Sequence, residues 1–197
     1  MRHKIINYFS KASFAYDKKS NSFPWKYLRN FESKMFKEMI SKKKYYRGLD
    51  IGSGSGFYTK ILKKKCKKLV AVDYSLNMLN NIKDDKIIKI NGDANKIRLN
   101  KKFDIIICLG IFEFNKNYKK IYQTVKIHSK KNTNIILMMP YNNLFSFFYY
   151  LFHRFHGISL NIQAKKKLTN DLKKYFIIDK KDYIFPFSMI VKCKIIT

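Results

Sequence analysis

Residues 48–57 read GLDIGSGSGF, and this glycine-rich stretch decides the fold that we expect. It joins an apolar strand to an amphipathic helix, and Gly52, Gly54 and Gly56 allow positive φ angles and the close approach of a ligand. The free N–H groups at the helix start add hydrogen-bond donors. Phe57 stands where the dinucleotide fingerprint needs its third glycine, and no Gly-Lys-Ser/Thr of a P-loop follows. A nucleotide-like ligand is expected here, held in neither of those two ways.

Short apolar runs alternate with longer amphipathic ones around this stretch, which is typical of parallel strands joined by helices. The expected strands cover residues 45–51, 69–73, 87–91, 103–109 and 134–139, and the expected helices cover 31–41, 57–65, 75–82 and 118–129, with Ser75 as an N-cap. After Pro140 an aromatic-rich segment precedes a Lys-rich helix at about 163–174 and two strands at about 176–184 and 187–196. These two strands are predicted to pair as a hairpin at the sheet edge.

The composition indicates a folded domain with a strongly basic surface. The chain has 197 residues, with Lys+Arg 42 against Asp+Glu 13 and a net charge of +29, yet 46% of its residues are hydrophobic. The lysines are spread along the whole chain, in a composition rich in Asn, Ile, Tyr and Phe. A solvated surface is therefore favoured, and a nucleic-acid-binding face remains the alternative.

The cysteines and the apolar runs bear on the compartment. Cys66, Cys108 and Cys193 form no CxxC pair, which excludes a disulfide framework and a thiolate zinc site; no metal is expected. No apolar run approaches the roughly 20 residues of a spanning helix. The N-terminus lacks the apolar core of a secretory signal, so we expect a cytoplasmic protein without a transmembrane segment.

Two acidic residues follow neighbouring strands of the predicted sheet. Asp73 ends the second strand, about 20 residues after Gly52, a distance at which a carboxylate can accept both hydroxyls of a ribose. Asp93 follows the third strand and suits an adenine amino group. Each can instead be a helix cap or a loop acid, but both belong to the carboxyl edge, where open α/β sheets bind ligands. Together with the glycine stretch they indicate a nucleoside site.

At this point the chain resembles the class I S-adenosylmethionine-dependent methyltransferases, of the small-molecule, type 11-like kind. The resemblance covers about residues 47–140 and rests on LDIGSGSG, VAVDYSLNML, GDA and FDIIICLGIFEF. It implies an α/β, Rossmann-like fold, with a mostly parallel seven-stranded sheet, a reversed last strand, helices on both faces, and S-adenosyl-L-methionine as the cofactor. It also implies one domain over 1–197, divided into an N-terminal helical cap (1–44), a cofactor-binding core (45–140), a lid insertion with a helix (141–174) and a terminal strand pair (175–197).

The resemblance further implies a set of cofactor contacts. Asp50 is expected to orient the glycine loop and, through water, the cofactor's ammonium group. The other contacts that it implies are Gly52, Ser53, Gly54 and Gly56 around the methionine part, Asp73 at the ribose, Tyr74 and Met78 on the adenine face, Asp93 and Ala94 at the adenine edge, and Leu109 with Gly110 at the rim after the fourth strand.

The methyl acceptor is less clearly indicated. The sequence LGIFEF lacks the Asn/Asp-Pro-Pro-aromatic motif of amino-methylating enzymes that act on DNA and some RNA, and Cys108 lies inside a strand without a preceding proline. Aromatic residues crowd the stretch 141–157, where related small-molecule enzymes often carry a lid. His153 and His156 share a helical face, and either is a candidate general base, as is Glu113; packing is the alternative for each.

Other residues have weaker indications. His3 and His128 are expected at the surface. In the N-terminal arm Tyr16, Trp25 and Arg29 are the residues best able to contact a ligand, although packing is favoured for the arm.

The sequence thus predicts methyl transfer to a small, largely apolar acceptor (a quinone, lipid or polyketide-like molecule), with oxygen favoured as the methylated atom. One alternative is an RNA methyltransferase whose lysines bind the RNA. The other is a binding or scaffold protein that has kept the fold and lost turnover. The oligomeric state stays open.

Overall fold

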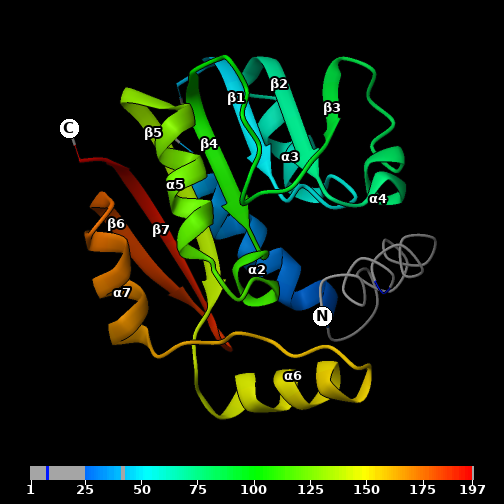
Figure 1. Cartoon of the computed structure of the whole chain (residues 1–197), viewed down its shortest axis with the longest axis vertical. Coiled ribbons are helices and arrows are strands. Elements are labelled where there is room, and N and C mark those ends of the chain that lie inside the picture. The colour runs from blue at the N-terminus through cyan, green and yellow to red at the C-terminus, as the bar shows by residue number, and fades with distance from the viewer. Residues whose placement is uncertain (1–7, 9–24, 41–42, 197) are drawn as a thin grey trace.

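Seven strands form one sheet in the order β3-β2-β1-β4-β5-β7-β6 (Figure 1). The structure is a computed structural model, and it describes residues 8, 25–40 and 43–196. The elements are α2 (Trp25–Met39), β1 (Tyr45–Ile51), α3 (Phe57–Lys63), β2 (Cys66–Asp73), α4 (Leu76–Asn80), β3 (Ile87–Asn91), β4 (Phe103–Leu109), the 3₁₀ helix η1 (Phe112–Phe114), α5 (Lys119–His128), β5 (Ser129–Pro140), α6 (Leu144–Phe155), α7 (Lys165–Lys173), β6 (Phe176–Ile184) and β7 (Ser188–Ile195).

The strand directions confirm the predicted topology. β1 pairs in parallel with β2 and β4, β2 with β3, and β4 with β5. β7 is antiparallel to both β5 and β6, so it is the reversed last strand. The terminal hairpin folds back with β7 against β5 and β6 at the edge. All five parallel strands therefore end at one edge of the sheet.

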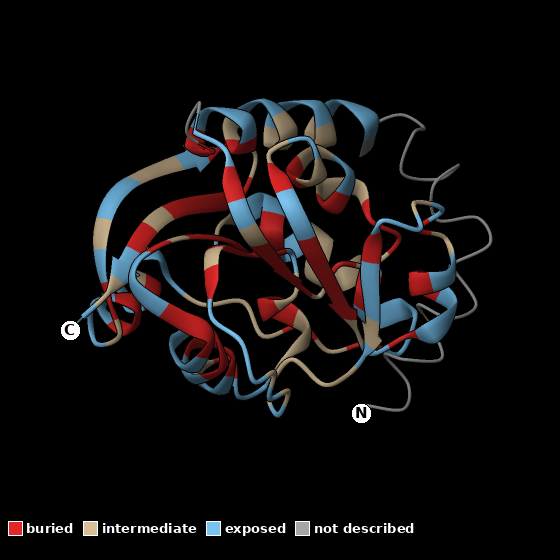
Figure 2. Ribbon diagram, turned by 90° about the horizontal axis from the view of Figure 1, so that it is seen from above, coloured by how far each residue is buried: buried red, intermediate tan, exposed pale blue. Residues whose placement is uncertain are grey.

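Helices cover both faces of the sheet (Figure 1). On one face Tyr122 of α5 and Leu168 of α7 are buried, and on the other Phe36 of α2 and Leu62 of α3. The side chains of β4 alternate between these two cores: Ile105 and Ile107 belong to one, Ile106 and Cys108 to the other. Figure 2 shows the central strands buried along most of their length, as expected for a sheet covered on both sides.

Some element limits differ from the sequence-based expectation. α2 begins at Trp25 rather than at 31, β2 at Cys66 rather than at 69, and β5 at Ser129 rather than at 134. The added parts of the two strands contain exposed lysines, Lys67 and Lys68 in β2 and two more in β5. Polar strand ends beyond the covered part of a sheet carry no apolar pattern, so sequence reasoning shortened them.

The expectation of a surface position for His128 is wrong. Its side chain is 1% exposed at the end of α5. Nε2 accepts the N–H of Leu99 at 2.9 Å, and Nδ1 lies 2.7 Å from the carbonyl oxygen of Thr124. Burial lowers the pKa of the ring, so His128 is a neutral link between a loop and α5. His3 lies outside the described residues.

Within the described part of the chain, no helix combines the length and the apolar character needed to cross a bilayer.

Candidate functional site

The glycine loop lies between β1 and α3, at the carboxyl edge of the sheet. Gly52 and Gly54 have φ angles of 78° and 54°, which favour glycine. The N–H groups of Gly52 and Ser53 donate to the carbonyl oxygen of Val72 at 2.8 and 3.0 Å, and this anchors the loop to β2. A Cβ on Gly52 would lie 2.5 Å from Ile111, whereas one on Gly54 would meet nothing within 4 Å. Gly52 thus allows close packing, and Gly54 leaves space beside the loop.

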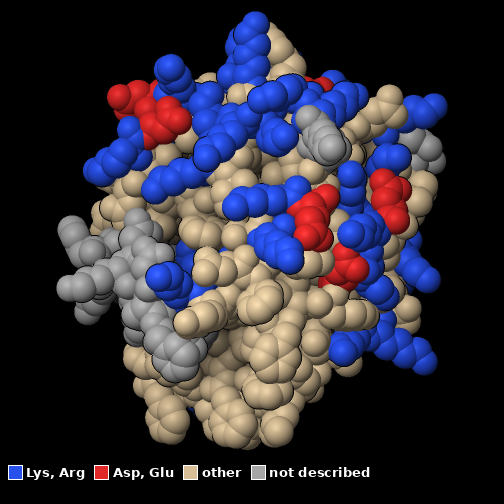
Figure 3. Space-filling model, turned by 180° about the vertical axis from the view of Figure 1, so that it is seen from behind, with Lys and Arg blue, Asp and Glu red and all other residues tan. Residues whose placement is uncertain are grey.

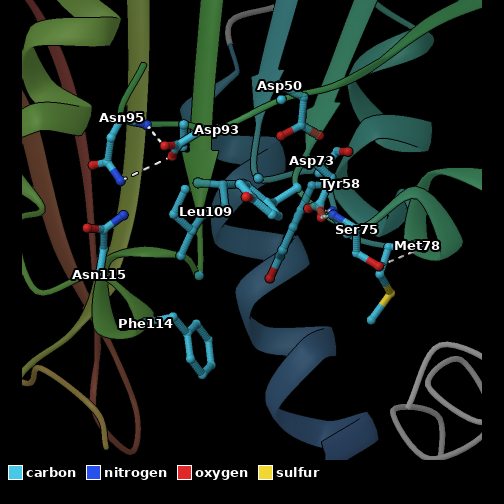
Figure 4. A pocket seen from close by; sticks show the side chains of 18 of the residues that line it. Asp50, Tyr58, Asp73, Ser75, Met78, Asp93, Asn95, Leu109, Phe114 and Asn115 are labelled. Carbon is cyan, nitrogen blue, oxygen red and sulfur yellow. Dashed lines mark hydrogen bonds between the residues drawn. The ribbon is translucent and has the colours of Figure 1, made fainter. Parts of the chain in front are cut away.

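Asp73 joins this loop to the next one. Its Oδ2 accepts the N–H of Gly54 at 2.8 Å, and its Oδ1 accepts the N–H of Ser75 at 2.9 Å. Ser75 in turn caps α4 by accepting the N–H of Met78. Burial raises the pKa of the Asp73 carboxyl, against the lowering effect of these hydrogen bonds. The carboxylate is therefore held in one orientation (Figure 4).

Asp50 and Asp93 bring two further carboxyl groups to the same place. Asp50 is 2% exposed, and its Oδ2 accepts a hydrogen bond from Thr59 at 2.6 Å. Burial, together with a smaller effect of the charge of Asp73, raises the pKa of Asp50 to about 7. Oδ1 of Asp93 accepts the N–H of Asn95 at 3.0 Å. Although the chain has a net charge of +29, these three carboxyl groups form a local acidic cluster that attracts a cation.

These groups line one cavity of about 470 Å³. Most of the predicted cofactor contacts line it: Asp50, Gly52, Ser53, Gly54, Asp73, Tyr74, Met78, Asp93, Ala94, Leu109 and Gly110. The remaining one, Gly56, is not among the lining residues. It is the N-cap of α3, has a φ of 87°, and packs so closely on Ile82 that a Cβ would lie 2.7 Å away.

The cavity suits an adenosyl sulfonium ligand. The side-chain oxygen of Ser53 is buried and has no hydrogen-bond partner among the described residues, so it can serve a ligand. A Cβ on Gly54 or Gly110 would meet nothing within 4 Å, which leaves their backbone open to close contact. The carboxylates of Asp50 and Asp73 are suited to an ammonium group and to ribose hydroxyls. Among the described residues, this cavity included, no group of three or more acidic, His or Cys side chains is arranged to hold a metal.

The three candidate bases are not among the residues that line this cavity. His153 is 6% exposed, and its ring packs on Phe114, a lining residue, at a centroid distance of 5.7 Å. His156 is exposed, with Nδ1 2.8 Å from the carbonyl oxygen of Phe152.

Glu113 is buried in η1. Burial raises its pKa to about 7, and the charge of Glu32 adds to the shift. Its Oε2 has no hydrogen-bond partner in the described part of the chain.

Sequence reasoning missed several residues that line the cavity. They are the aromatic residues Phe57, Tyr58 and Phe114, with polar groups from Asn115 to Asn117 and Lys120. Their signals were available, because FY directly follows the last loop glycine and NKN follows the fourth strand. Arg29, which the sequence indicated, lines the cavity with its guanidinium 4.6 Å from the centre of the Phe57 ring. Tyr16 and the side chain of Trp25 lie outside the described residues.

This strand order, with its reversed last strand, and an acid-lined glycine loop are those of the class I S-adenosylmethionine-dependent methyltransferases. Residues 49–137 match the family model described as a methyltransferase domain, so this part of the chain is such a domain.

Two curated relatives match part of the chain. The malonyl-[acyl-carrier protein] O-methyltransferase of Priestia megaterium is 28% identical in an alignment 133 residues long, which covers 62% of this chain and 46% of the relative. The protein of the same name from Calditerrivibrio nitroreducens is 31% identical over 87 residues, or 40% of this chain and 33% of the relative. The matched part of the chain thus spans less than half the length of either relative.

Solved structures show the same fold at low identity. A complex of DhpI with S-adenosylhomocysteine (SAH) superposes with a TM-score of 0.78 at 12% identity and covers 98% of this chain and 96% of its own. Magnesium protoporphyrin IX methyltransferase from Synechocystis PCC 6803 with bound SAH gives a TM-score of 0.76 at 14% identity over 100% of both chains. These likenesses extend the methyltransferase fold beyond residues 49–137 to the whole chain.

Proposed function

We propose that this chain transfers a methyl group from S-adenosyl-L-methionine to an oxygen of a small, largely apolar acceptor, such as a quinone, a lipid or a polyketide-like molecule. The observation that carries the proposal is one cavity with two kinds of lining. Asp50, Asp73 and Asp93 contribute carboxyl groups to it, and Phe57, Tyr58 and Phe114 contribute aromatic rings. The first set suits a cationic nucleoside, and the second suits an apolar molecule.

The cofactor, when bound, supplies an electrophilic methyl group on a sulfonium. The residues of this chain position the two reactants and exclude water, which is the main contribution that an in-line displacement needs. Asp50 holds the cationic end, Asp73 fixes the loop and offers its remaining lone pairs to the ribose, and Phe114 shields the acceptor side. Arg29 and Lys120 line the same cavity and can favour an acceptor oxygen that is already acidic.

Two observations support oxygen as the methylated atom. Both curated relatives are named as O-methyltransferases. In addition, no histidine is among the residues lining the described cavity. A carboxylate is already a nucleophile near neutral pH and needs no strong base.

An RNA acceptor is the second candidate. Figure 3 shows Lys and Arg side chains spread over much of one face, and Lys96 and Lys116 line the cavity itself. RNA binding through these lysines would weaken steeply with salt. The apolar wall and the absence of an Asn/Asp-Pro-Pro-aromatic motif after β4 favour the small acceptor.

A transfer assay distinguishes these candidates and also a scaffold protein without turnover. Full-length protein is incubated with methyl-labelled cofactor and, separately, with the organic-soluble, RNA and protein fractions of a cell extract. Label in the organic-soluble fraction supports the proposal, and its release by mild base identifies the product as a methyl ester. Label in RNA, or no transfer to any fraction by protein that binds SAH, contradicts it.

A further inference from the structure

Helix α6 presents its more apolar face to solvent. Ser146 and His153 are its buried side chains. The exposed side chains include large apolar residues, at 68% for Leu144, 47% for Phe145, 52% for Phe147, 60% for Phe148 and 88% for Phe155. A surface helix of a soluble domain normally has the opposite arrangement, with its apolar stripe toward the core. An outward apolar face of this size indicates an interaction surface.

The helix is fixed firmly to the domain. Asn143 and Ser146 form a capping box at its start, with hydrogen bonds of 2.8 and 2.9 Å. Nδ2 of Asn143 donates to the carbonyl oxygen of Pro186 at 2.7 Å. On the inner side Tyr149 stacks on Phe187 at a centroid distance of 5.0 Å. The helix is therefore anchored at its start and on its inner side to the turn between β6 and β7.

The apolar surface continues beyond the helix. Phe185, in the turn between β6 and β7, is 72% exposed and lies edge-on to Phe145 at 5.2 Å. We call the combined surface the aromatic face; its members are Leu144, Phe145, Phe147, Phe148, Phe155 and Phe185. Figure 3 shows an end of the molecule that is mostly neither acidic nor basic, which is the α6 end of Figure 1.

The charged side chains of α6 and of the start of α7 are basic. The sequence has no Asp or Glu between Glu113 and Asp171. Arg154 is exposed on α6 itself. Lys165 to Lys167 begin α7, and Nζ of Lys165 lies over the rings of Tyr141 and Tyr183 at 4.2 and 4.6 Å. Apolar rings beside basic groups, with no acidic residue in the segment, are typical of helices that lie in the interface of an anionic membrane.

The aromatic face and the cavity belong to the same end of the molecule. The parallel strands point toward α6 (Figure 1), and the cavity lies at their carboxyl edge. A surface that touches α6 would thus lie near the cavity, beyond the ends of the strands.

We propose that the aromatic face docks on the surface of an anionic lipid bilayer, with its rings at the boundary of headgroups and acyl chains and the basic side chains at the headgroups. The patch is outward-facing and extends over a helix and a separate turn, so a deformable lipid surface fits it better than a single protein groove does. This inference goes beyond the proposed function, because it states where the protein lies and not what it methylates.

The test is cosedimentation of the full chain with vesicles, without cofactor or acceptor. We expect binding to phosphatidylcholine vesicles that contain phosphatidylglycerol, weaker binding to pure phosphatidylcholine, and a decrease with salt. The double variant Phe147→Ser, Phe148→Ser is expected to bind the vesicles at least about ten-fold more weakly than the wild type. Ile88→Ser is the matched control, because Ile88 is 52% exposed on β3, at the other edge of the sheet; its vesicle binding should not change.

Thermal unfolding and SAH binding of the variants serve as fold checks, and Phe155→Ser replaces the double variant if that chain does not fold. Equal vesicle binding by the folded serine variants and the wild type overturns the proposal. The absence of binding to anionic vesicles also overturns the proposal. This holds even if light scattering shows self-association, or if an acidic carrier protein binds the face instead. The vesicle assay does not measure methyl transfer. A chain that binds vesicles but transfers no methyl group therefore refutes the proposed function and leaves the docking proposal intact.

Discussion

The residues proposed to bind the cofactor and those proposed to contact the acceptor contribute to the cavity by different means. Among the first, backbone groups and fixed carboxylates dominate: Gly54 donates its N–H to Asp73, and Ser75 does the same from the next loop. Among the second, side chains such as Phe57 and Phe114 line the cavity. Few residue types fit the backbone geometry of the glycine loop, whereas many apolar side chains can line the rest of the cavity. Changes in the first set should therefore affect fold and cofactor binding, and changes in the second should affect the acceptor alone.

The largest expected effect is that of Gly52→Ala compared with Gly54→Ala. Both have positive φ, which costs an alanine about 1 to 2 kcal/mol. Only Gly52 also faces a clash, with Ile111, so overpacking adds about 1 to 3 kcal/mol. Denaturant unfolding should show the larger loss of stability for Gly52→Ala, while Gly54→Ala should lose mainly SAH affinity. Equal losses of stability would show that the loop packing is not as described.

The next effect is that of Asp73→Ala on cofactor binding. Removing the carboxylate frees both the Gly54 and the Ser75 N–H groups and removes the acceptor proposed for the ribose. SAH affinity should fall by about 1 to 3 kcal/mol in equilibrium dialysis. Asp85→Ala is the control, because Asp85 is exposed beyond α4. An unchanged affinity in Asp73→Ala would remove Asp73 from the site.

A pH dependence follows from Asp50. Its pKa is about 7 in the folded chain against an ordinary 3.8, so the folded chain retains a proton that the unfolded chain has lost between these values. The free energy of unfolding therefore contains a contribution that is fully present below about pH 4 and is lost as the pH rises through 7. Asp50→Asn should reduce this slope and stabilise the apo-protein by about 1 to 2 kcal/mol above pH 7.

Cofactor binding should show the opposite trend. Deprotonated Asp50 attracts the ammonium group, so SAH affinity is expected to rise as the pH passes 7, and Asp50→Asn should flatten that rise. Denaturant titrations and calorimetry from pH 5 to about pH 8 measure both slopes. The same slopes in Asp50→Asn as in the wild type would assign them to another group, with Glu113 as the first alternative, because its pKa is also raised to about 7.

A smaller and more selective effect is expected at the acceptor wall. Phe114→Ala should raise the KM of the acceptor by a factor that corresponds to about 1 to 2 kcal/mol of lost apolar contact. The affinity for SAH should stay within about two-fold of the wild-type value. The decisive readout is steady-state kinetics with each substrate varied in turn. Parallel losses for cofactor and acceptor would show that the two sets of residues are not separate.

The smallest effect is that of His156→Gln. The ring is exposed and outside the cavity lining, so kcat and its pH profile should change by less than about two-fold, as for ordinary surface substitutions. A large fall in kcat with intact SAH affinity would restore His156 as a general base.

The same contrast explains what the sequence was able to predict. Gly52, Asp73 and Asp93 were identifiable because glycine spacing and strand-end acids reflect backbone requirements that are local in sequence. Glu32 was not: it reaches Tyr58 and Ser188 through hydrogen bonds of 2.8 and 3.1 Å that join three distant segments. The aromatic density of 141–157 was evident, but no local pattern showed that Phe145, Phe147 and Phe148 are exposed rather than part of the cavity lining. The cavity is lined instead by Phe57, Tyr58 and Phe114.

Calorimetric titration of the full-length wild type with SAH tests the central claim most directly, with ATP and NAD as competitors for the same cavity. An adenosyl sulfonium site predicts saturable binding of SAH by the chain. It predicts little or no heat from ATP or NAD, because their phosphates would lie beside the carboxyl groups of Asp50, Asp73 and Asp93. No binding of SAH, or binding of NAD as tight as that of SAH, would contradict it.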